Sequence, residues 1–289
     1  MGYRRYDYRG PDDLREMQAL SARAGFWHPG ELAWSRFEHV GREPEWPTAL
    51  WEHDGRTVAW AWAQLPGSLD LELDPEHREL AGEILGWFAA LAPGERTVTV
   101  LDGGLSLTRY GYREDVQAPF FVRLRRELAD LPEPVLPDGY RMRPVGGAED
   151  APLRARVHRA AFSTPEHPSR VSAQSYLQVM GAWPYRSELD WLVETDGGEP
   201  AAFCLLWLEG EEAVLEPVGT DPAHRRRGLA GAVTLAALRA ARGLGARSAR
   251  VNARGDDAYP SARATYESIG FRHRGGLRSR TYVSDRKSM

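Results

Sequence analysis

The chain has 289 residues, about twice the length of a typical single domain, and 42% of them are hydrophobic, so we expect two packed units and not a disordered polymer. No stretch approaches the roughly 18 apolar residues of a membrane-spanning helix, and the first residues have no apolar signal core, so a cytoplasmic protein with no membrane contact is expected. The 37 basic residues are outnumbered by 41 acidic ones, which argues against nucleic acid as a partner.

A proline cluster divides the chain. Residues 127–139 contain three prolines, which disfavour both a helix and a central strand, so a linker is expected there. We therefore predict a first domain over residues 1–126 and a second over residues 140–289.

The two blocks repeat the same landmarks in the same order. Residues 74–78 (DPEHR) parallel residues 221–225 (DPAHR), and an apolar helix is expected after each of them. Further along, residues 110–113 (YGYR) parallel residues 269–272 (IGFR). One fold therefore occurs twice.

The second block reads as alternating strands and helices, with a hairpin that turns at residues 196–198. Such an order predicts an α/β fold with a mixed, mostly antiparallel sheet and flanking helices. The expected strands are 140–145, 189–195, 201–208, 212–220, 247–253 and 278–283, and the expected helices are 149–162, 228–242 and 260–268.

Several kinds of reactive site are disfavoured. Cys204, the only cysteine, lies in an apolar run and is expected to be a buried strand residue and not a catalytic thiol. No histidine pair has metal-ligand spacing with a carboxylate or cysteine, so no metal site is expected. The Gly-x-Ser-x-Gly motif of serine hydrolases does not occur in the sequence.

The segment 225–230 (RRRGLA) joins the end of an expected strand to the start of an expected helix. The first turn of a helix has unpaired backbone N–H groups and a positive dipole end, which favour an anion. Gly228 lacks a Cβ, so a pyrophosphate could approach the main chain, and Arg225, Arg226 and Arg227 could add charge-assisted contacts. A solvated basic turn is the alternative interpretation.

These residues resemble the GNAT superfamily of acyl-CoA-dependent N-acyltransferases. Arg225, Gly228 and Ala230 fit its Arg-x-x-Gly-x-Ala signature, and residues 264–271 (ATYESIGF) resemble its Tyr-x-x-x-Gly-Phe segment. The resemblance is strong over residues 205–275 and extends weakly over the whole chain. It implies two tandem GNAT-like domains, acetyl-CoA as co-substrate and a small-molecule primary amine as acceptor.

The resemblance also implies the cofactor contacts. Family members often have an asparagine seven residues before the motif tyrosine, where this chain has Tyr259, so Asn252 on the preceding strand is a candidate substitute. A strand-end hydrogen bond is the alternative role for Asn252. The predicted cofactor-binding residues are Val218, Gly219, Thr220, Arg225, Arg226, Arg227, Gly228, Leu229, Ala230, Asn252, Tyr259 and Ser261.

Thioester aminolysis requires a proton acceptor for the amine and a proton donor for the leaving thiolate. Tyr266 is the predicted donor, since a phenol is competent at hydrogen-bonding distance, and core packing beside Phe271 is its alternative role. Glu216 is the predicted base, although Pro217 could introduce a bulge that changes its direction, and a structural salt bridge is its alternative role.

The first copy has lost the phosphate loop. Its turn is shorter by two residues and has Glu79 where the second copy has residues 226–228, so we expect no cofactor there. Seven of the ten tryptophans lie in this block, and Trp60 and Trp62 are predicted to fill the vacated cleft, with ordinary core packing as the alternative. The first copy could still wall one side of an acceptor cleft, and residues 163–188 could form a lid or a plain surface excursion.

The sequence thus predicts an N-acetyltransferase with one working site in the second copy. The competing hypothesis is a non-catalytic acyl-CoA sensor or partner-binding scaffold, in which Glu216 and Tyr266 are only structural.

Overall fold

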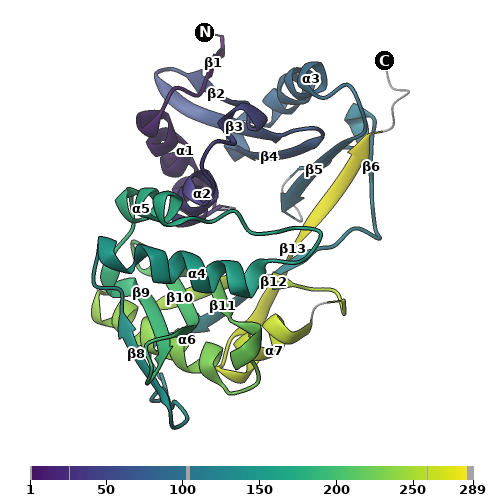
Figure 1. Ribbon diagram of the computed structural model, residues 1–289. Helices are drawn as coiled ribbons and strands as arrows, with labels where there is room; N and C mark the ends of the chain where they lie inside the picture. Colours follow the sequence, from purple (N-terminus) through teal and green to yellow (C-terminus); the bar gives the residue numbers. More distant parts are fainter. Residues whose placement is uncertain (1, 26, 102–104, 259, 285–289) are drawn as a thin grey trace.

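The first copy of the fold is built from a meander of strands with helices on both faces (Figure 1). The computed structural model describes residues 2–25, 27–101, 105–258 and 260–284, without the side chains of residues 274–276. The elements of this copy are β1 (Arg4–Asp7), α1 (Pro11–Ala24), α2 (Pro29–Phe37), β2 (Thr48–His53), β3 (Arg56–Gln64), β4 (Ser68–Leu73), α3 (Ala81–Leu91), β5 (Arg96–Leu101), β6 (Tyr112–Glu114) and β7 (Phe121–Glu127).

The second copy contains every element expected from its sequence, which confirms the α/β class. Its last strand is longer than expected, beginning at Arg272 and not at residue 278. The elements are β8 (Tyr140–Pro144), α4 (Ala151–Phe162), α5 (Ala173–Gly181), β9 (Asp190–Thr195), β10 (Pro200–Glu209), β11 (Glu212–Thr220), α6 (Leu229–Gly243), β12 (Ser248–Arg254), α7 (Pro260–Ser268) and β13 (Arg272–Ser284).

Equivalent side chains confirm that the two copies are repeats. The hydroxyl of Tyr3 lies 2.9 Å from Nδ1 of His77, and the hydroxyl of Tyr140 lies 2.8 Å from Nδ1 of His224. In both pairs the rings meet edge to face at 89°. The same tyrosine–histidine contact therefore fixes the first strand of each copy to the DPxH turn before its main apolar helix.

The two copies exchange their last strands. β7, from the first block, pairs with β12, and β13 pairs with β7 at its start and with β5 and β6 further along. In Figure 1, β13 runs from the lower copy into the upper one. The sheet order is β1-β2-β3-β4-β5-β13-β7-β12-β11-β10-β9-β8, with β6 beside β13. The segments before and after the proline-rich linker thus belong to one continuous sheet.

Side-chain alternation explains why β7 fits in the second sheet. Val122 and Leu124 are buried in the core of the second copy, whereas the residues between and after them are arginines with longer, more exposed side chains. A strand with one apolar and one charged face pairs where its apolar face meets a core.

Helix α2 of the first copy also packs into the second copy. Ala33 and Trp34 of α2 share a hydrophobic cluster with Leu205 and Trp207 of β10. A Cβ placed on Gly30 would lie 2.1 Å from Cβ of Trp207, so only glycine permits this approach. The two copies therefore share a packed core where α2 meets β10, and we call the boundary between the copies the seam.

No helix in the described part of the chain is long and apolar enough to cross a membrane.

We predict that the two copies unfold together. Because Leu124 is fully buried in the second core and its strand lies next to β13, Leu124→Ala should destabilise the whole protein by about 2–5 kcal/mol. The measurement is urea unfolding followed by tryptophan fluorescence, which reports mainly on the first copy, and by far-ultraviolet circular dichroism. Coincident midpoints are expected in wild type and variant, and separate midpoints would contradict a shared sheet.

Candidate functional site

Strands β11 and β12 separate after a short parallel pairing. The pairs run from Glu212 opposite Ser248 to Val214 opposite Arg250, and none follows among the described residues. Beyond this point Val218, Gly219 and Thr220 pair with β10 on one side only. The second copy therefore has two divergent strands, with one edge of β11 left unpaired at residues 218–220.

A β-bulge lies at the point of divergence. Leu215 pairs with Leu206 and Val218 with Cys204, so β11 has one residue more than β10 across this step. The expected bulge at Pro217 is confirmed. The bulge also interrupts the alternation of side chains along β11. The face on which the Glu216 side chain lies therefore could not be predicted from the residues beside it.

The loop before α6 presents unpaired backbone donors. Gly228 caps the helix with φ of +77°, and Arg226 has φ of +62°, so both adopt the left-handed conformation. The first hydrogen bond into the helix runs from the N–H of Ala232 to the carbonyl of Gly228, at 3.0 Å. Within the described residues, the N–H groups of 226–230 have no acceptor. This arrangement suits an anion such as a pyrophosphate.

The loop arginines differ in what they contact. Arg225 donates to the carbonyl of Thr220 at 3.2 Å and to that of Ala161 at 3.1 Å, which fastens the loop to β11 and α4. Arg226 and Arg227 are exposed, and the guanidinium of Arg227 lies 6.0 Å from the ring centre of Tyr140. Arg226 and Arg227 are therefore the side chains left to supply positive charge.

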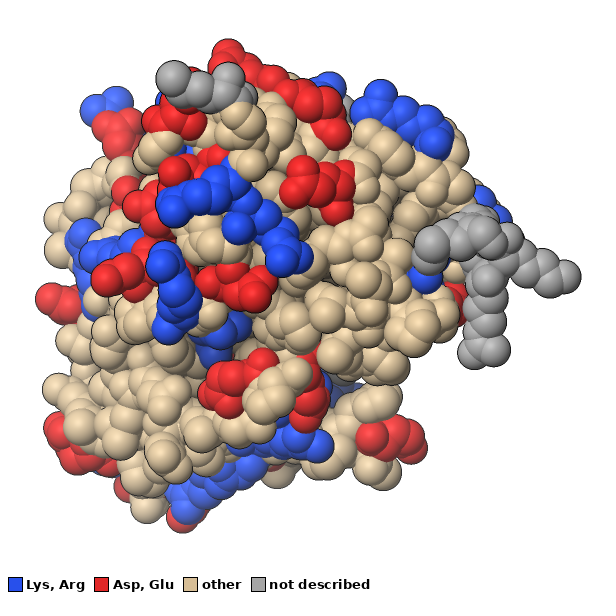
Figure 2. Space-filling model, turned by 90° about the horizontal axis from the view of Figure 1, so that it is seen from above, with Lys and Arg blue, Asp and Glu red and all other residues tan. Residues whose placement is uncertain are grey.

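One face of the surface carries charges of both signs. On the face shown in Figure 2, basic and acidic side chains are mixed, with no wide area of one sign. This face therefore offers no broad attraction for an anionic cofactor.

The remaining loop and helix positions are a core residue and two surface residues. Leu229 is buried in the core of the second copy, Ala230 is half-buried and Ser261 is exposed in the first turn of α7. The carbonyl of Ser261 accepts a hydrogen bond from the hydroxyl of Thr265 at 2.9 Å. Tyr259 lies outside the described residues.

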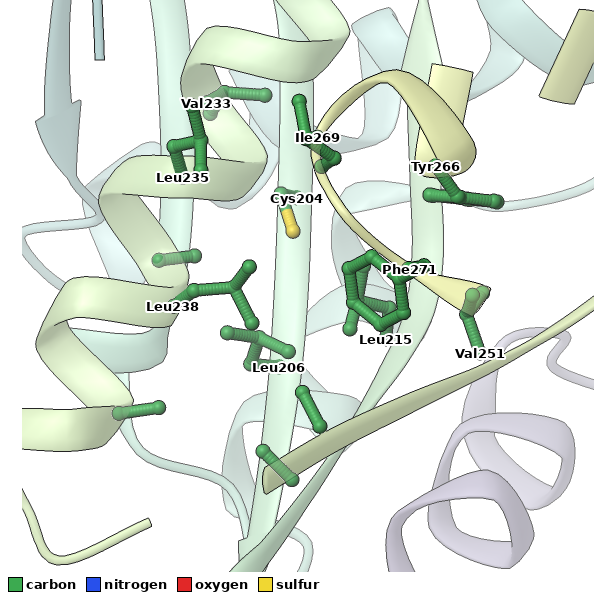
Figure 3. Close-up of a cluster of buried hydrophobic side chains, with 14 of the residues drawn as sticks. Cys204, Leu206, Leu215, Val233, Leu235, Leu238, Val251, Tyr266, Ile269 and Phe271 are labelled. Atoms are coloured by element: carbon green, nitrogen blue, oxygen red, sulfur yellow. The ribbon is translucent and has the colours of Figure 1, made fainter. Parts of the chain in front are cut away.

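Tyr266 projects from α7 into the core beside Phe271 (Figure 3), with ring centres 5.9 Å apart. Its side chain is 8% exposed, and its hydroxyl has no hydrogen-bond partner among the described residues. Burial raises its pKa well above the usual value for a phenol, and the neighbouring Cys204 thiol and Glu216 carboxyl add to this shift. The ring therefore packs in the core of the second copy, and the phenol stays protonated.

Cys204 is a buried β10 residue, as expected. Figure 3 shows its thiol among Leu206, Leu215 and Phe271. Burial raises its pKa to about 12, so the thiolate does not form at neutral pH.

Glu216 is a half-buried carboxylate at the divergence of β11 and β12. Burial, and then the charges of Glu31 and Glu38, raise its pKa to about 8. Within the described residues it has no ion pair shorter than 4.0 Å, which contradicts the salt-bridge alternative. Its main-chain carbonyl accepts a hydrogen bond from the indole of Trp207 at 2.6 Å, which holds the backbone there.

A cavity of about 380 Å³ lies at the seam between the copies, and Glu216 lines it. Asp70 is also on its wall, and burial raises the pKa of this carboxyl to about 6. Eight of the twelve lining residues come from the first copy, two of them from β7, so this copy does form one wall. The lining residues are Trp27, Glu31, Ser35, Asp70, Thr99, Leu101, Phe121, Arg123, Glu216, Asn252, Leu277 and Ser279.

Glu31 joins the copies through charge and hydrogen bonds. It accepts from the side-chain amide of Asn252 at 2.7 Å and from its own helix cap, the N–H of His28, at 2.7 Å. Arg250 lies 3.5 Å away. Asn252 is therefore directed across the seam, and its amide is already used by Glu31.

Glu31 and Asp70 were not among the site residues predicted from the sequence. Glu31 was detectable only as part of a helix cap, and Asp70 only as one polar residue between two leucines on β4. Neither pattern distinguishes a cavity wall from a solvent-facing position.

The first-copy turn is closed. A short 3-10 helix (Pro75–Leu80) runs directly into α3, and the exposed Glu79 accepts a hydrogen bond from the hydroxyl of Tyr3. Trp60 and Trp62 do not fill a cleft, because they wall a second cavity of about 110 Å³. The prediction of cleft-filling tryptophans is therefore wrong.

The segment 163–188 contains α5, which packs against α2 and α4. None of its residues lines either of the two cavities described. The lid interpretation thus finds no support, and the segment instead fastens the copies together: the carbonyl of Trp183 accepts from Gln18 of α1 at 2.9 Å.

Comparisons with known proteins agree with the repeated fold. The model of the acetyltransferase (GNAT) family matches residues 157–271. The mycothiol acetyltransferase of Streptomyces coelicolor is 32% identical over 215 residues, covering 71% of this chain and 68% of that protein. For the Rhodococcus erythropolis enzyme of the same name the identity is 30%, covering 76% and 79%. The Mycobacterium marinum enzyme is 29% identical, and only 58% of its length is matched.

Solved structures match along the full chain. A tandem GNAT protein from the clavulanic acid biosynthesis pathway has a TM-score of 0.65 at 14% identity, with 100% of both chains covered. A GCN5-related N-acetyltransferase from Sphaerobacter thermophilus has a TM-score of 0.60 at 18% identity, covering 99% and 96%. These likenesses concern the fold. Together with the relatives in sequence, they establish that the chain is a tandem-domain acetyltransferase that belongs to the GNAT family.

Proposed function

We propose that the second copy transfers an acetyl group from acetyl-CoA to a primary amine of a small molecule by direct attack. The comparisons support acyl-CoA-dependent N-acetyl transfer in general. The observation that carries the finer proposal is the position of Glu216, which lies where β11 leaves β12 and lines the seam cavity. Cofactor and acceptor would thus meet at one carboxylate.

The residues at the loop and the divergent strands fit acetyl-CoA. The unpaired N–H groups of 226–230 suit its pyrophosphate, with Arg226 and Arg227 supplying charge. The free edge of β11 at Val218–Thr220 suits the pantetheine arm and the thioester carbonyl. Bound acetyl-CoA would supply an electrophilic acyl carbon at this edge.

Glu216 would take the proton from the attacking amine. The pKa of the Glu216 carboxyl, about 8, is closer to the pKa of an ammonium group than the pKa of an ordinary carboxyl is. This smaller difference favours transfer of a proton from the amine to Glu216. The charges of Glu31 and Glu38 maintain this pKa. These carboxylates also attract the cationic acceptor before it loses its proton.

Tyr266 would protonate the leaving thiolate. Its raised pKa keeps the phenol protonated at every physiological pH, and its hydroxyl has no competing partner among the described residues. The raised pKa makes the phenol a weaker acid than the thiol, whose pKa is about 8.5, so Tyr266 would first stabilise the departing thiolate by donating a hydrogen bond to it.

The acceptor would enter the seam cavity. Asp70 on the wall of the first copy favours a cation, whereas Glu31 is compensated by Arg250 and Asn252, and Arg123 also lines the cavity. Mycothiol-type synthesis is one candidate reaction, because the sequence relatives are named mycothiol acetyltransferases.

We predict that Gly228→Asp abolishes acetyl-CoA binding. A carboxylate at the helix start would repel the pyrophosphate and occupy its site. Isothermal titration calorimetry should give one site per chain for wild type and none for the variant. Gly228→Asn is the matched control: asparagine tolerates the left-handed conformation without the charge, so it should weaken binding much less. Two sites in wild type would contradict a first copy without cofactor.

We predict that Glu216→Gln lowers kcat/KM by about 10²–10⁴-fold at pH 8. In wild type, activity should rise with pH and level off above about 8, because the base must be deprotonated. Removing a neighbouring charge with Glu38→Gln should shift this rise to lower pH. If activity rises at the same pH in Glu38→Gln as in wild type, and the rise is still present in Glu216→Gln, the titrating group is the amine and not Glu216.

We predict that Tyr266→Phe lowers kcat by about 10²-fold or more near pH 7 and leaves acetyl-CoA affinity unchanged. The loss should shrink above about pH 8.5, where the departing thiolate no longer needs a proton. Turnover measured across this range tests the role. A variant with wild-type turnover at all pH values would leave Tyr266 as a core residue.

A further inference from the structure

The cavity walled by Trp60 and Trp62 adjoins the proposed acceptor cavity. Trp27, Ser35 and Asp70 line both, so these three residues form a common wall between them. The second cavity has a volume of about 110 Å³, which accommodates a small polar head group. Nothing in the transfer of an acetyl group to a simple amine requires this space.

Four of the eleven residues that line this second cavity are tryptophans. The ring centres of Trp27 and Trp60 are 6.0 Å apart, and those of Trp46 and Trp62 are 5.7 Å apart. Indole faces attract cations more strongly than other aromatic faces do. The outer side of the cluster shows this already, because Arg36 lies 5.2 Å from the ring centre of Trp62.

Two carboxylates complete the walls without a cationic partner. In the described part of the chain neither Glu38 nor Asp70 has an arginine within 4.0 Å. The guanidinium of Arg42 also lines the cavity, where it lies 5.2 Å from the ring centre of Trp46 and pairs with Glu45 at 2.7 Å. The ring of His39 lies 4.0 Å from Glu38.

Burial raises the pKa of Glu38 to about 7 and that of Asp70 to about 6, while burial lowers the pKa of His39. A bound cation would relieve the cost of ionising these two carboxyl groups, and the neutral imidazole would not oppose it.

One buried wall atom also lacks a partner. Trp62 is 4% exposed, and its indole N–H has no acceptor within the described residues. Pairing this donor requires an acceptor, such as a water molecule beside the ligand, because an ammonium or trimethylammonium group supplies none. The preference for a cation therefore rests on the indole faces and the two carboxylates alone.

We infer that the acceptor carries a second cationic group, and that this group binds between the tryptophans, Glu38 and Asp70 while the reacting amine lies at Glu216. The acceptor class is thus a diamine or an amine with a quaternary ammonium group. The inference rests on the proposed function for the identity of the reacting end. Binding of the distal end depends only on the second cavity.

Matched ligands test this inference without turnover. Aminoalkyl trimethylammonium ions with spacers of two to five carbons are compared with their neutral carbon isosteres, in which a tert-butyl group replaces the trimethylammonium. Calorimetric titration into the full chain at pH 8, without acetyl-CoA, gives the ratio of the two dissociation constants. At one spacer length or more, the cation should bind about 10-fold more tightly.

Variants assign the preference to this cavity. The double variant Glu38→Gln, Asp70→Asn preserves side-chain shape and should bring the ratio to about 1, as should Trp62→Leu. Glu43→Gln, an exposed carboxylate on the segment after α2, is the control and should keep the wild-type ratio. If Trp62→Leu does not fold, the two carboxamide substitutions carry the test.

The outcomes separate this inference from the proposed function. A ratio near 1 at every spacer length in wild type, or a full ratio in the double variant, overturns the inference even if simple amines are acetylated. A wild-type preference that the double variant removes supports it, even if no amine is acetylated, in which case the proposed function fails alone.

Discussion

The exchange of last strands between the two copies is the constraint on which the rest of the structure depends. β7 completes the second sheet, and β13 continues from there into the first, so that neither copy can close its sheet without the other. Helix α2 then packs against β10 with the close contact at Gly30. Because the copies are packed together in this way, residues as far apart in sequence as Asp70 and Glu216 line one cavity at their seam.

Electrostatics gives this seam its chemical character. Several carboxylates line or approach it, and they differ in what compensates them. Glu31 has Asn252 and Arg250, and therefore acts as a structural anion between the copies. Glu216, Glu38 and Asp70 have raised pKa values because burial is not offset by a close cation. The protein thus holds proton-accepting groups where a cationic amine would supply the missing charge.

The sequence predicted what is local. The helix start at Gly228, the bulge at Pro217 and the burial of Cys204 follow from short patterns of turn residues and apolar runs. Strand exchange could not be predicted, since alternation in β7 reports which face is buried and not which copy buries it. Asp70 and Glu31 were missed for the same reason. Trp60 and Trp62 were correctly seen as unusual, but composition cannot tell a ring that fills space from one that encloses it.

We expect acetyl-CoA to bind only where β11 and β12 diverge. Hydrogen–deuterium exchange of the full chain with and without acetyl-CoA can locate the binding site, because the unpaired N–H groups of residues 226–230 would become hydrogen-bonded. Protection is expected over residues 216–230, with no change over residues 70–81 of the first copy. Equal protection in both copies, or none in the second, would contradict this expectation.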